Sequence, residues 1–122
     1  MIEVYLYLAT NGYAFNGGSS PTVGLSGFIL GGGHGNLSRK YGMAIDQLIE
    51  AQIVLANGRV VTARPDNEYN DLLWAIRGAG HANFGVVTQF KFKLLEQPKV
   101  LSAISLVWII TIHHLCISYH HC

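Results

Sequence analysis

The stretch that decides the fold is FNGGSSPTVGLSGFILGGGHG, residues 15–35, which holds eight of the 14 glycines in this chain of 122 residues. Each glycine costs conformational entropy on folding. Because the stretch keeps large apolar residues such as Phe28 and Ile29 between its glycines, it predicts tight turns around a short buried helix. Backbone amides with no Cβ nearby can approach phosphates or the edge of a ring closely. We therefore expect a flat or charged ligand to lie here.

Two better-known glycine motifs do not fit this stretch. The residues after Gly31 read GGHGN, residues 32–36. They match neither the G-x-G-x-x-G fingerprint of dinucleotide-binding folds nor the G-x-x-x-x-G-K-[ST] loop that binds nucleotide phosphates. The sequence therefore argues against a plain Rossmann domain and against a P-loop domain.

Composition says more about the possible binding partners than about the fold. Eight Lys and Arg against seven Asp and Glu give a formal charge of +1, so we expect neither a nucleic acid nor a membrane surface as partner. Half of the residues are hydrophobic, which suits a single buried core. Cys116 and Cys122 are confined to the last seven residues and say little about redox compartment. No signal-peptide pattern marks the N-terminus, so the localisation stays open.

The hydrophobic pattern predicts an α+β fold, an antiparallel sheet with helices against it. Asn57-Gly58 lies between apolar segments at 46–56 and 60–61, which predicts a β-hairpin. Residues 70–77 carry apolar side chains at helical spacing, and 86–95 alternate as in a half-buried strand. A helix of one or two turns is expected over 23–30, after a short extended piece at 13–15. Residues 2–10, by contrast, fit a strand or a helix equally well.

Three blocks of sequence carry a family resemblance. They are GSSPTVGLSG (18–27) followed by GGGHG (31–35), SRKYG (38–42) and Asp46; VLANGRVV (54–61); and DLLWAIRG (71–78) running into NFGVVT (83–88). In these blocks, from about Val4 to Trp108, the chain resembles the FAD-binding domain of berberine bridge enzyme-like oxidases. These belong to the vanillyl-alcohol-oxidase or PCMH-type flavoprotein superfamily. The order and spacing of the blocks are the family's own.

The resemblance implies the C-terminal part of a PCMH-type FAD-binding domain, an antiparallel or mixed sheet flanked by short helices. It favours a helix end over residues 2–10, closed at Asn11-Gly12. We expect a partial FAD-binding domain over 1–97, the first strand of a substrate domain over 98–108 and an unrelated apolar, His-rich tail over 109–122. On this view the upstream half of the FAD-binding domain and most of the substrate domain are missing. The exposed apolar face left behind would make the chain prone to aggregate.

The resemblance also implies where the flavin would lie. The loop 18–27 would follow the isoalloxazine ring and the pyrophosphate, and the strand that starts at 85–87 would supply apolar backbone. The implied cofactor-binding residues are Gly18, Ser19, Ser20, Thr22, Val23, Gly24, Gly27, Gly32, Gly33, Gly85, Val86 and Val87. The alternative is a glycine-rich turn that merely packs on a helix, and for Gly32 and Gly33 neither interpretation is preferred.

Ser20 decides the mode of flavin attachment. Many relatives have cysteine at this position, and its thiolate attaches to the flavin. Serine cannot form that thioether, and the histidine that attaches to the ring methyl in relatives would lie before Met1. We therefore expect FAD to be bound without a covalent link at Ser20. His34 and His81 are interpreted as ordinary loop residues.

No catalytic residue and no metal ligand is assigned. Arg39 and Lys40 are interpreted as solvated charges, although they could reach a phosphate, and Asp46 and Asp71 as residues that cap a turn and a helix N-terminus. Asn36-Leu37-Ser38 is formally a glycosylation sequon, discounted because a glycan would collide with the fold.

The C-terminal tail holds four histidines and both cysteines, but it lacks the paired spacing that zinc sites use. Residues 100–112 are too short to span a membrane, and a span of about 20 residues would bury His113 and His114.

Function is therefore expected at two levels. The intact relative would be an FAD-linked oxidoreductase in which a small-molecule substrate gives hydride to the flavin and oxygen reoxidises it. Substrates in the family include alkaloids, oligosaccharides and secondary metabolites. The chain itself would be an inactive flavin-binding portion. The alternative is a non-catalytic truncated fragment that binds no cofactor and at best packs against another polypeptide.

Overall fold

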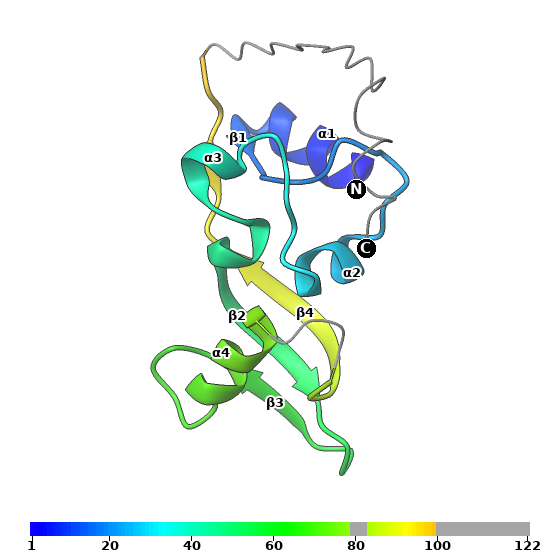
Figure 1. Cartoon of the computed structure of the whole chain (residues 1–122), viewed down its shortest axis with the longest axis vertical. Helices are drawn as coiled ribbons and strands as arrows, with labels where there is room; N and C mark the ends of the chain where they lie inside the picture. Colours follow the sequence, from blue (N-terminus) through cyan, green and yellow to red (C-terminus); the bar gives the residue numbers. More distant parts are fainter. Residues whose placement is uncertain (79–82, 100–122) are drawn as a thin grey trace, which may run out of the picture.

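The computed structural model describes residues 1–78 and 83–99, in which short helices and antiparallel strands alternate along the chain (Figure 1). The elements are α1 (Ile2–Thr10), β1 (Tyr13–Ala14), α2 (Leu25–Leu30), α3 (Ser38–Tyr41), the 3-10 helix η1 (Ala44–Gln47), β2 (Leu48–Val54), β3 (Val60–Ala63), α4 (Asn70–Gly78), β4 (Val86–Phe92) and β5 (Leu95–Glu96). The α+β class predicted from the sequence is confirmed. The expected tail at 109–122 and most of the expected strand at 98–108 lie outside the described residues.

The main sheet has the strand order β3-β2-β4, and both pairings are antiparallel. The predicted hairpin joins β2 to β3. Gly58 has a φ of +78°, and the N–H of Leu55 donates to the carbonyl of Arg59 at 2.9 Å. Asn57 stabilises the turn because its side-chain oxygen accepts the N–H of Arg59 at 3.0 Å. The Asn-Gly signal therefore identified both the turn and the pairing.

The expected single strand over 86–95 is wrong in one respect, because the structure divides it between two sheets. Phe92 pairs with Leu48, the first residue of β2, so β4 has no partner strand beyond that point. The N–H of Lys93 then donates to the carbonyl of Gln47 at 2.8 Å. Two residues later, β5 pairs with β1 in a separate two-stranded sheet. The chain thus leaves the main sheet where its neighbour ends.

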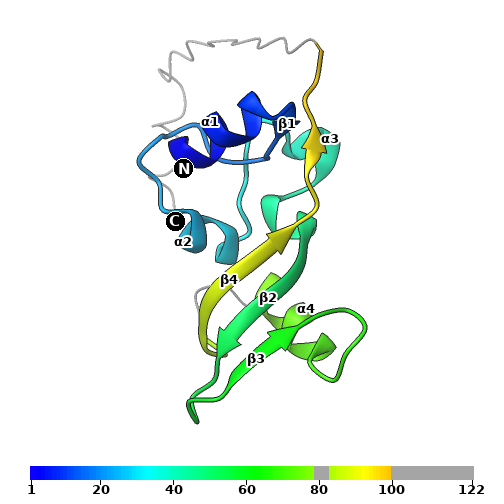
Figure 2. The ribbon, with the colours of Figure 1, turned by 180° about the vertical axis from the view of Figure 1, so that it is seen from behind.

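One face of the main sheet is covered by α4, as the two opposite views show (Figures 1 and 2). Ile53 of β2 and Val61 of β3 are buried, and so are Leu73 and Ile76 of α4. Burial of such side chains against each other is the main stabilising term of this half of the molecule. Trp74, on the same helix, is 78% exposed.

The remaining helices lie beyond one end of the main sheet (Figure 1). The alternative of a strand at 2–10 is excluded, since these residues form α1, which ends at Thr10 and is followed by its C-cap Asn11 and by Gly12 with a φ of +76°. α1 is apolar on most sides: Leu8 is buried, whereas Leu6 is 63% exposed. The described part of the chain contains no helix long and apolar enough to cross a membrane.

Candidate cofactor site

The residues predicted to hold a flavin occur on three elements. These are the β1–α2 loop (residues 15–24), α2 with the glycines after it, and the start of β4. In both views the outer part of the loop, α2 and the start of β4 lie along the same edge of the molecule (Figures 1 and 2). The helix α2 begins two residues later than expected, because Gly24 is extended and its carbonyl accepts the first helical N–H, from Phe28, at 3.2 Å.

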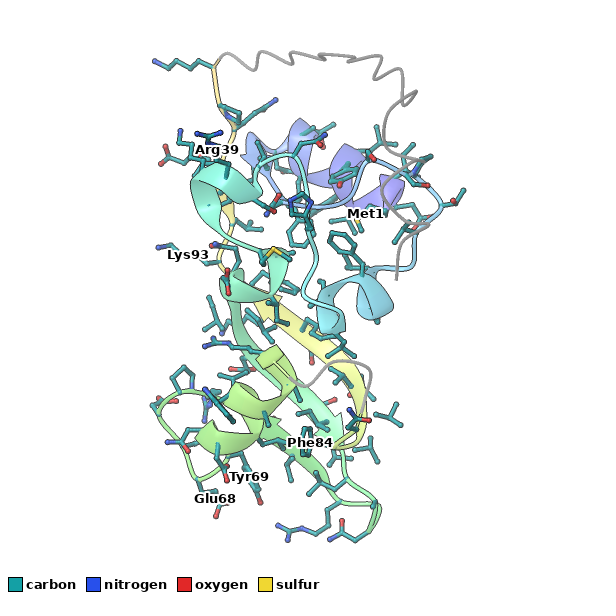
Figure 3. All side chains as sticks on the ribbon, viewed as in Figure 1. Met1, Arg39, Glu68, Tyr69, Phe84 and Lys93 are labelled. Carbon is teal, nitrogen blue, oxygen red and sulfur yellow. The ribbon has the colours of Figure 1, made fainter. Side chains whose placement is uncertain are left out.

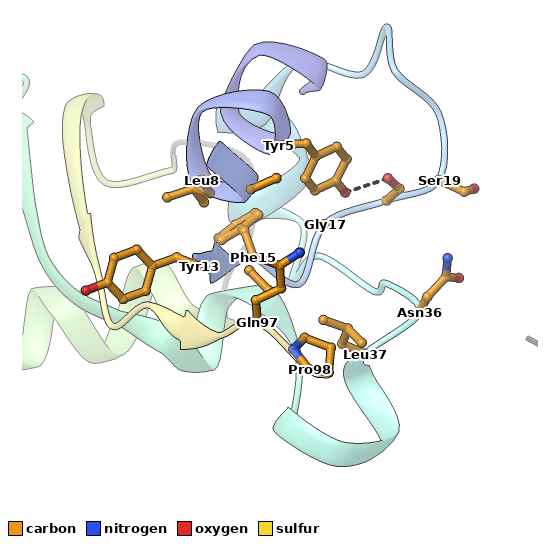
Figure 4. A pocket seen from close by; sticks show the side chains of 13 residues that line it. Tyr5, Leu8, Tyr13, Phe15, Gly17, Ser19, Asn36, Leu37, Gln97 and Pro98 are labelled. Carbon is orange, nitrogen blue, oxygen red and sulfur yellow. Dashed lines mark hydrogen bonds between the residues drawn. The ribbon is translucent and has the colours of Figure 1, made fainter. Parts of the chain in front are cut away.

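The β1–α2 loop is held by the N-terminal helix. The Tyr5 hydroxyl donates to the carbonyl of Gly18 at 2.7 Å, the bond drawn in Figure 4. Burial raises the pKa of the Tyr5 hydroxyl above its usual value of 10.0. The N-terminal ammonium of Met1 donates to the carbonyl of Val23 at 3.2 Å. Sequence reasoning assigned no such role to this helix.

Asn16 joins the two glycine-rich segments, and it too was missed from the sequence. Its side chain is 1% exposed. The amide nitrogen donates to Ser38 Oγ at 2.9 Å and to the carbonyl of Gly42 at 2.6 Å. The amide oxygen accepts the N–H of Leu37 at 3.1 Å. One buried side chain thus fixes the start of the loop to the region that follows the GGGHG run.

Several of the predicted glycines are required by the chain's own packing. A Cβ on Gly33 would lie 2.6 Å from the Cβ of Ala44, and Gly33 also has a φ of +73°. At Gly85, where φ is +144°, a Cβ would lie 2.5 Å from the carbonyl oxygen of Val54. A Cβ on Gly18 would come within 3.2 Å of the Phe28 ring. At Gly33 and Gly85 packing explains the glycine without a ligand, whereas at Gly18 a Cβ would need only a small shift of the Phe28 ring.

Gly24 and Gly27 are different. A Cβ added at either residue meets no described atom within 4 Å. Gly24 has φ −69° and ψ 129°, values that any residue can adopt. Gly27 lies inside α2, where alanine is the better helix former by about 1 kcal/mol. Neither the packing nor the backbone geometry of the described chain requires glycine at these two positions.

The other predicted residues face outward or lie at the edge of the main sheet. Ser19, Ser20 and Thr22 are exposed. The Ser20 and Thr22 hydroxyl oxygens are 3.3 Å apart. At the start of β4, Val86 is 64% exposed and Val87 is half-buried. The loop thus presents polar side chains, whereas the strand presents apolar ones.

A cavity of about 480 Å³ lies beside the loop, between α1, β1 and the residues after β5 (Figure 4). Apolar side chains such as Leu8, Phe15 and Pro98 line much of it. Of the predicted cofactor-binding residues, only Gly18 and Ser19 reach it. The volume suits a small ligand, but this cavity is not where the predicted set converges.

Several polar residues were predicted to have ordinary structural roles. Asp46 accepts the N–H of Met43 at 2.7 Å and caps η1, and Asp71 accepts the N–H of Leu72 at 2.8 Å at the start of α4. Arg39 is exposed on α3, at the opposite edge of the molecule from α2 (Figure 3). Asn36 is also exposed, so the expected collision of a glycan with the fold is not seen among the described residues.

The remaining candidate residues are histidines and cysteines. His34 is exposed in its loop. His81, Cys116 and Cys122 lie outside the described residues. Within residues 1–78 and 83–99, no three His, Cys, Asp or Glu side chains gather as metal ligands would.

Comparison with known proteins gives consistent matches. The family described as "FAD binding domain" matches residues 1–64. The chain is 45% identical over 104 residues to berberine bridge enzyme-like 17 of Arabidopsis thaliana, which is 84% of this chain and 19% of that protein. It is 44% identical over 102 residues to the FAD-linked oxidoreductase YvdP of Bacillus subtilis, 83% of this chain and 22% of that protein.

Solved structures agree with the sequence matches. BBE-like 1 of Physcomitrella patens superposes with a TM-score of 0.73 at 46% identity, over 77% of this chain and 20% of that one. The 6-hydroxy-D-nicotine oxidase of Arthrobacter nicotinovorans gives 0.72 at 41% identity, over 77% and 20%. The chain spans about a fifth of the length of the relatives it matches.

Proposed function

The chain belongs to the FAD binding domain family, and from this premise we propose that it binds FAD along the edge formed by the β1–α2 loop, α2 and the start of β4. The sequence resemblance to berberine bridge enzyme-like flavoproteins is confirmed. The chain is a portion of the FAD-binding domain of such oxidoreductases.

The observation that carries the proposal is the open space at Gly24 and Gly27. A glycine that neither packing nor geometry requires leaves room for a ligand to approach the backbone closely. Gly78, at the end of α4, has the same open space, so it is the position of Gly24 and Gly27 next to the exposed polar residues of the loop that supports the proposal. Both glycines are exposed; Gly24 ends the loop that displays Ser20 and Thr22, and Gly27 lies in the helix that follows it. The residues present therefore fit a flat, anionic group such as FAD.

Each part of the edge would make its own contribution. Ser19, Ser20 and Thr22 would donate hydrogen bonds to polar atoms of the cofactor. Gly24 and Gly27 would let it approach the backbone. The backbone turns of this edge would depend on glycines, namely Gly18 within the loop, Gly32 and Gly33 after α2, and Gly85 before β4. Apolar contacts with the cofactor would come from Val23, Val86 and Val87. Bound FAD supplies the redox chemistry, since the flavin accepts a hydride from the substrate.

Ser20 makes attachment through a thioether impossible at this position, so FAD is proposed to be non-covalent there. A solved neighbour, the glucooligosaccharide oxidase of Acremonium strictum, is described as carrying a 6-S-cysteinyl, 8α-N1-histidyl FAD (TM-score 0.72, 36% identity, 78% of this chain and 20% of that one). A thiolate is the nucleophile in such a link, and a serine hydroxyl is far less acidic. Mass spectrometry of the tryptic peptide that ends at Arg39 tests this. A flavin adduct on that peptide would refute the proposal, and Ser20→Cys should create one.

For the whole protein we propose an FAD-linked oxidoreductase that oxidises a small molecule and is reoxidised by oxygen. The isolated chain should show no turnover, because it spans about a fifth of the relatives' length. Peroxide release with alcohol, sugar and alkaloid panels should stay at background. The second candidate is a fragment that binds no cofactor, and the exposed apolar residues Leu6 and Trp74 favour it, since they suit packing against another polypeptide.

A glycine substitution separates the two candidates. FAD is titrated into the chain while the quenching of flavin fluorescence is recorded. Gly27→Ala should leave the fold as stable or stabilise it by up to about 1 kcal/mol, and it should weaken FAD binding. Gly78→Ala is the matched control, because a Cβ there also meets no described atom within 4 Å. Equal FAD affinity in all three proteins would remove Gly27 from the site, and no binding by the wild-type chain would favour the second candidate.

A further inference from the structure

Two aromatic rings from two different helices contact consecutive glycines of the β1–α2 loop. A Cβ on Gly17 would overlap the Tyr5 hydroxyl, and one on Gly18 would lie 3.2 Å from the Phe28 ring. Both rings are therefore in contact with the loop backbone. At Gly17 this approach is possible only because the residue has no side chain, and at Gly18 a side chain would make the contact with Phe28 tight.

The same helix that carries Tyr5 binds three carbonyls of the loop. Besides the Gly18 carbonyl, held by the Tyr5 hydroxyl at 2.7 Å, the N–H of Ile2 donates to the carbonyl of Pro21 at 3.4 Å and the Met1 ammonium to that of Val23 at 3.2 Å. A carbonyl oxygen that is engaged by α1 cannot turn toward a bound anion. The helix therefore keeps these three carbonyl oxygens away from the surface on which FAD is proposed to bind.

Of these three bonds, the one from Tyr5 is the shortest and the only one made by a side chain. It acts on Gly18, which follows another glycine, so the backbone it fixes is intrinsically mobile. A loop that is fixed before its ligand arrives binds at a lower entropic cost. Loss of this one hydroxyl should therefore lower both the order of the loop and its affinity for the ligand.

We infer that Tyr5 is a positioning residue for the cofactor loop: its hydroxyl, by holding the Gly18 carbonyl, presets the Gly17–Ser19 backbone against which FAD would lie. That the ligand is FAD rests on the proposed function, whereas the effect of Tyr5 on the order of the loop does not. Tyr5 touches no reacting atom in this proposal and acts only through the loop.

Backbone order in the ligand-free chain tests the first half of the inference. Amide order parameters from NMR relaxation are compared in the wild type, in Tyr5→Phe and in the control Tyr7→Phe, which removes a hydroxyl from a side chain of the same helix that is 71% exposed. In Tyr5→Phe the amides of residues 17–19 should fall from the rigid value of about 0.85 toward 0.6, while those of β2 stay rigid. A matching loss of order in β2 would show a general structural role and overturn the inference.

FAD titration tests the second half. One lost hydrogen bond should weaken FAD binding by about 3- to 10-fold in Tyr5→Phe and not in Tyr7→Phe. If the wild type binds FAD and both variants bind it equally well, the inference is wrong. If the wild type binds no FAD, the proposed function of the isolated chain fails, and the order parameters still decide whether Tyr5 fixes the loop. A wild-type loop that is already mobile, with order parameters below about 0.6, would overturn the inference without any variant.

Discussion

Replacement of Asn16 by alanine should destabilise the chain far more than a typical substitution of a polar residue. The Asn16 side chain is 1% exposed and makes three hydrogen bonds, to Ser38, Gly42 and Leu37. Two of these partners are backbone groups. Alanine at this position leaves the N–H of Leu37 and the carbonyl of Gly42 without the bonds that Asn16 supplies.

The size of the effect follows from those two groups. Ser38 Oγ still accepts the N–H of Gly35 at 2.9 Å, so it is not left unpaired. A buried polar group that loses its partner costs about 1–3 kcal/mol. For two partly buried groups, we expect Asn16→Ala to lower the free energy of unfolding by about 3 kcal/mol. That is a large fraction of the 5–15 kcal/mol typical of a native domain.

Asn67→Ala provides the control. Asn67 likewise makes three hydrogen bonds, in its case all to backbone groups, those of Arg64, Tyr69 and Thr62, but it is only half-buried. Because water can replace the lost bonds, the expected cost is about 1 kcal/mol. Urea unfolding followed by circular dichroism at 222 nm measures both variants, and the m-values should agree with the wild type. If Asn16→Ala costs no more than Asn67→Ala, the argument from burial is wrong.

Three further predictions concern the same regions. Because burial raises the pKa of Tyr5 in the folded state, the stability that this one group contributes should be fully present below pH 10.0 and be lost as pH rises through the raised pKa, and Tyr5→Phe should reduce this alkaline loss in urea titrations. Gly33→Ala should cost about 3 kcal/mol in urea unfolding, because the Cβ lies 2.6 Å from that of Ala44 at a φ of +73°; a neutral result would contradict the packing argument. The chain should self-associate through exposed apolar residues such as Leu6, and Leu6→Lys should lower the mass found by light scattering, whereas an already monomeric wild type would refute this.

Local signals predicted the elements that local chemistry determines. Asn57-Gly58 identified the β2–β3 hairpin because a turn of that kind needs a residue with positive φ, and Gly58 has one. The spacing of apolar residues predicted α4 because residues three and four positions apart lie on the same face of a helix. Residues 2–10 remained ambiguous because most of them are apolar, so no period separates helix from strand, and only the family resemblance favoured α1.

Features that depend on distant residues could not be predicted in this way. The division of the last strand follows from where β2 begins, and Leu48 and Phe92 are far apart in the sequence. The contact of Tyr5 with Gly18 joins residues 13 positions apart, and Asn16 reaches residues 21 to 26 positions away. Nothing in the sequence marks Asn16 as buried. Its role became visible only with the second glycine-rich segment in place.

The glycines of the stretch 15–35 serve two different purposes. Gly35 illustrates the first: a Cβ there would lie 2.6 Å from Oδ1 of Asn16, so glycine lets two segments cross closely. Gly27 illustrates the second, because alanine would fit α2 and stabilise it. A sequence selected for the stability of the described chain alone would have little reason to keep that glycine. Under the proposed function, Gly27 would let FAD approach the backbone closely, and the exposed Ser20 and Thr22 would supply polar groups to the same ligand.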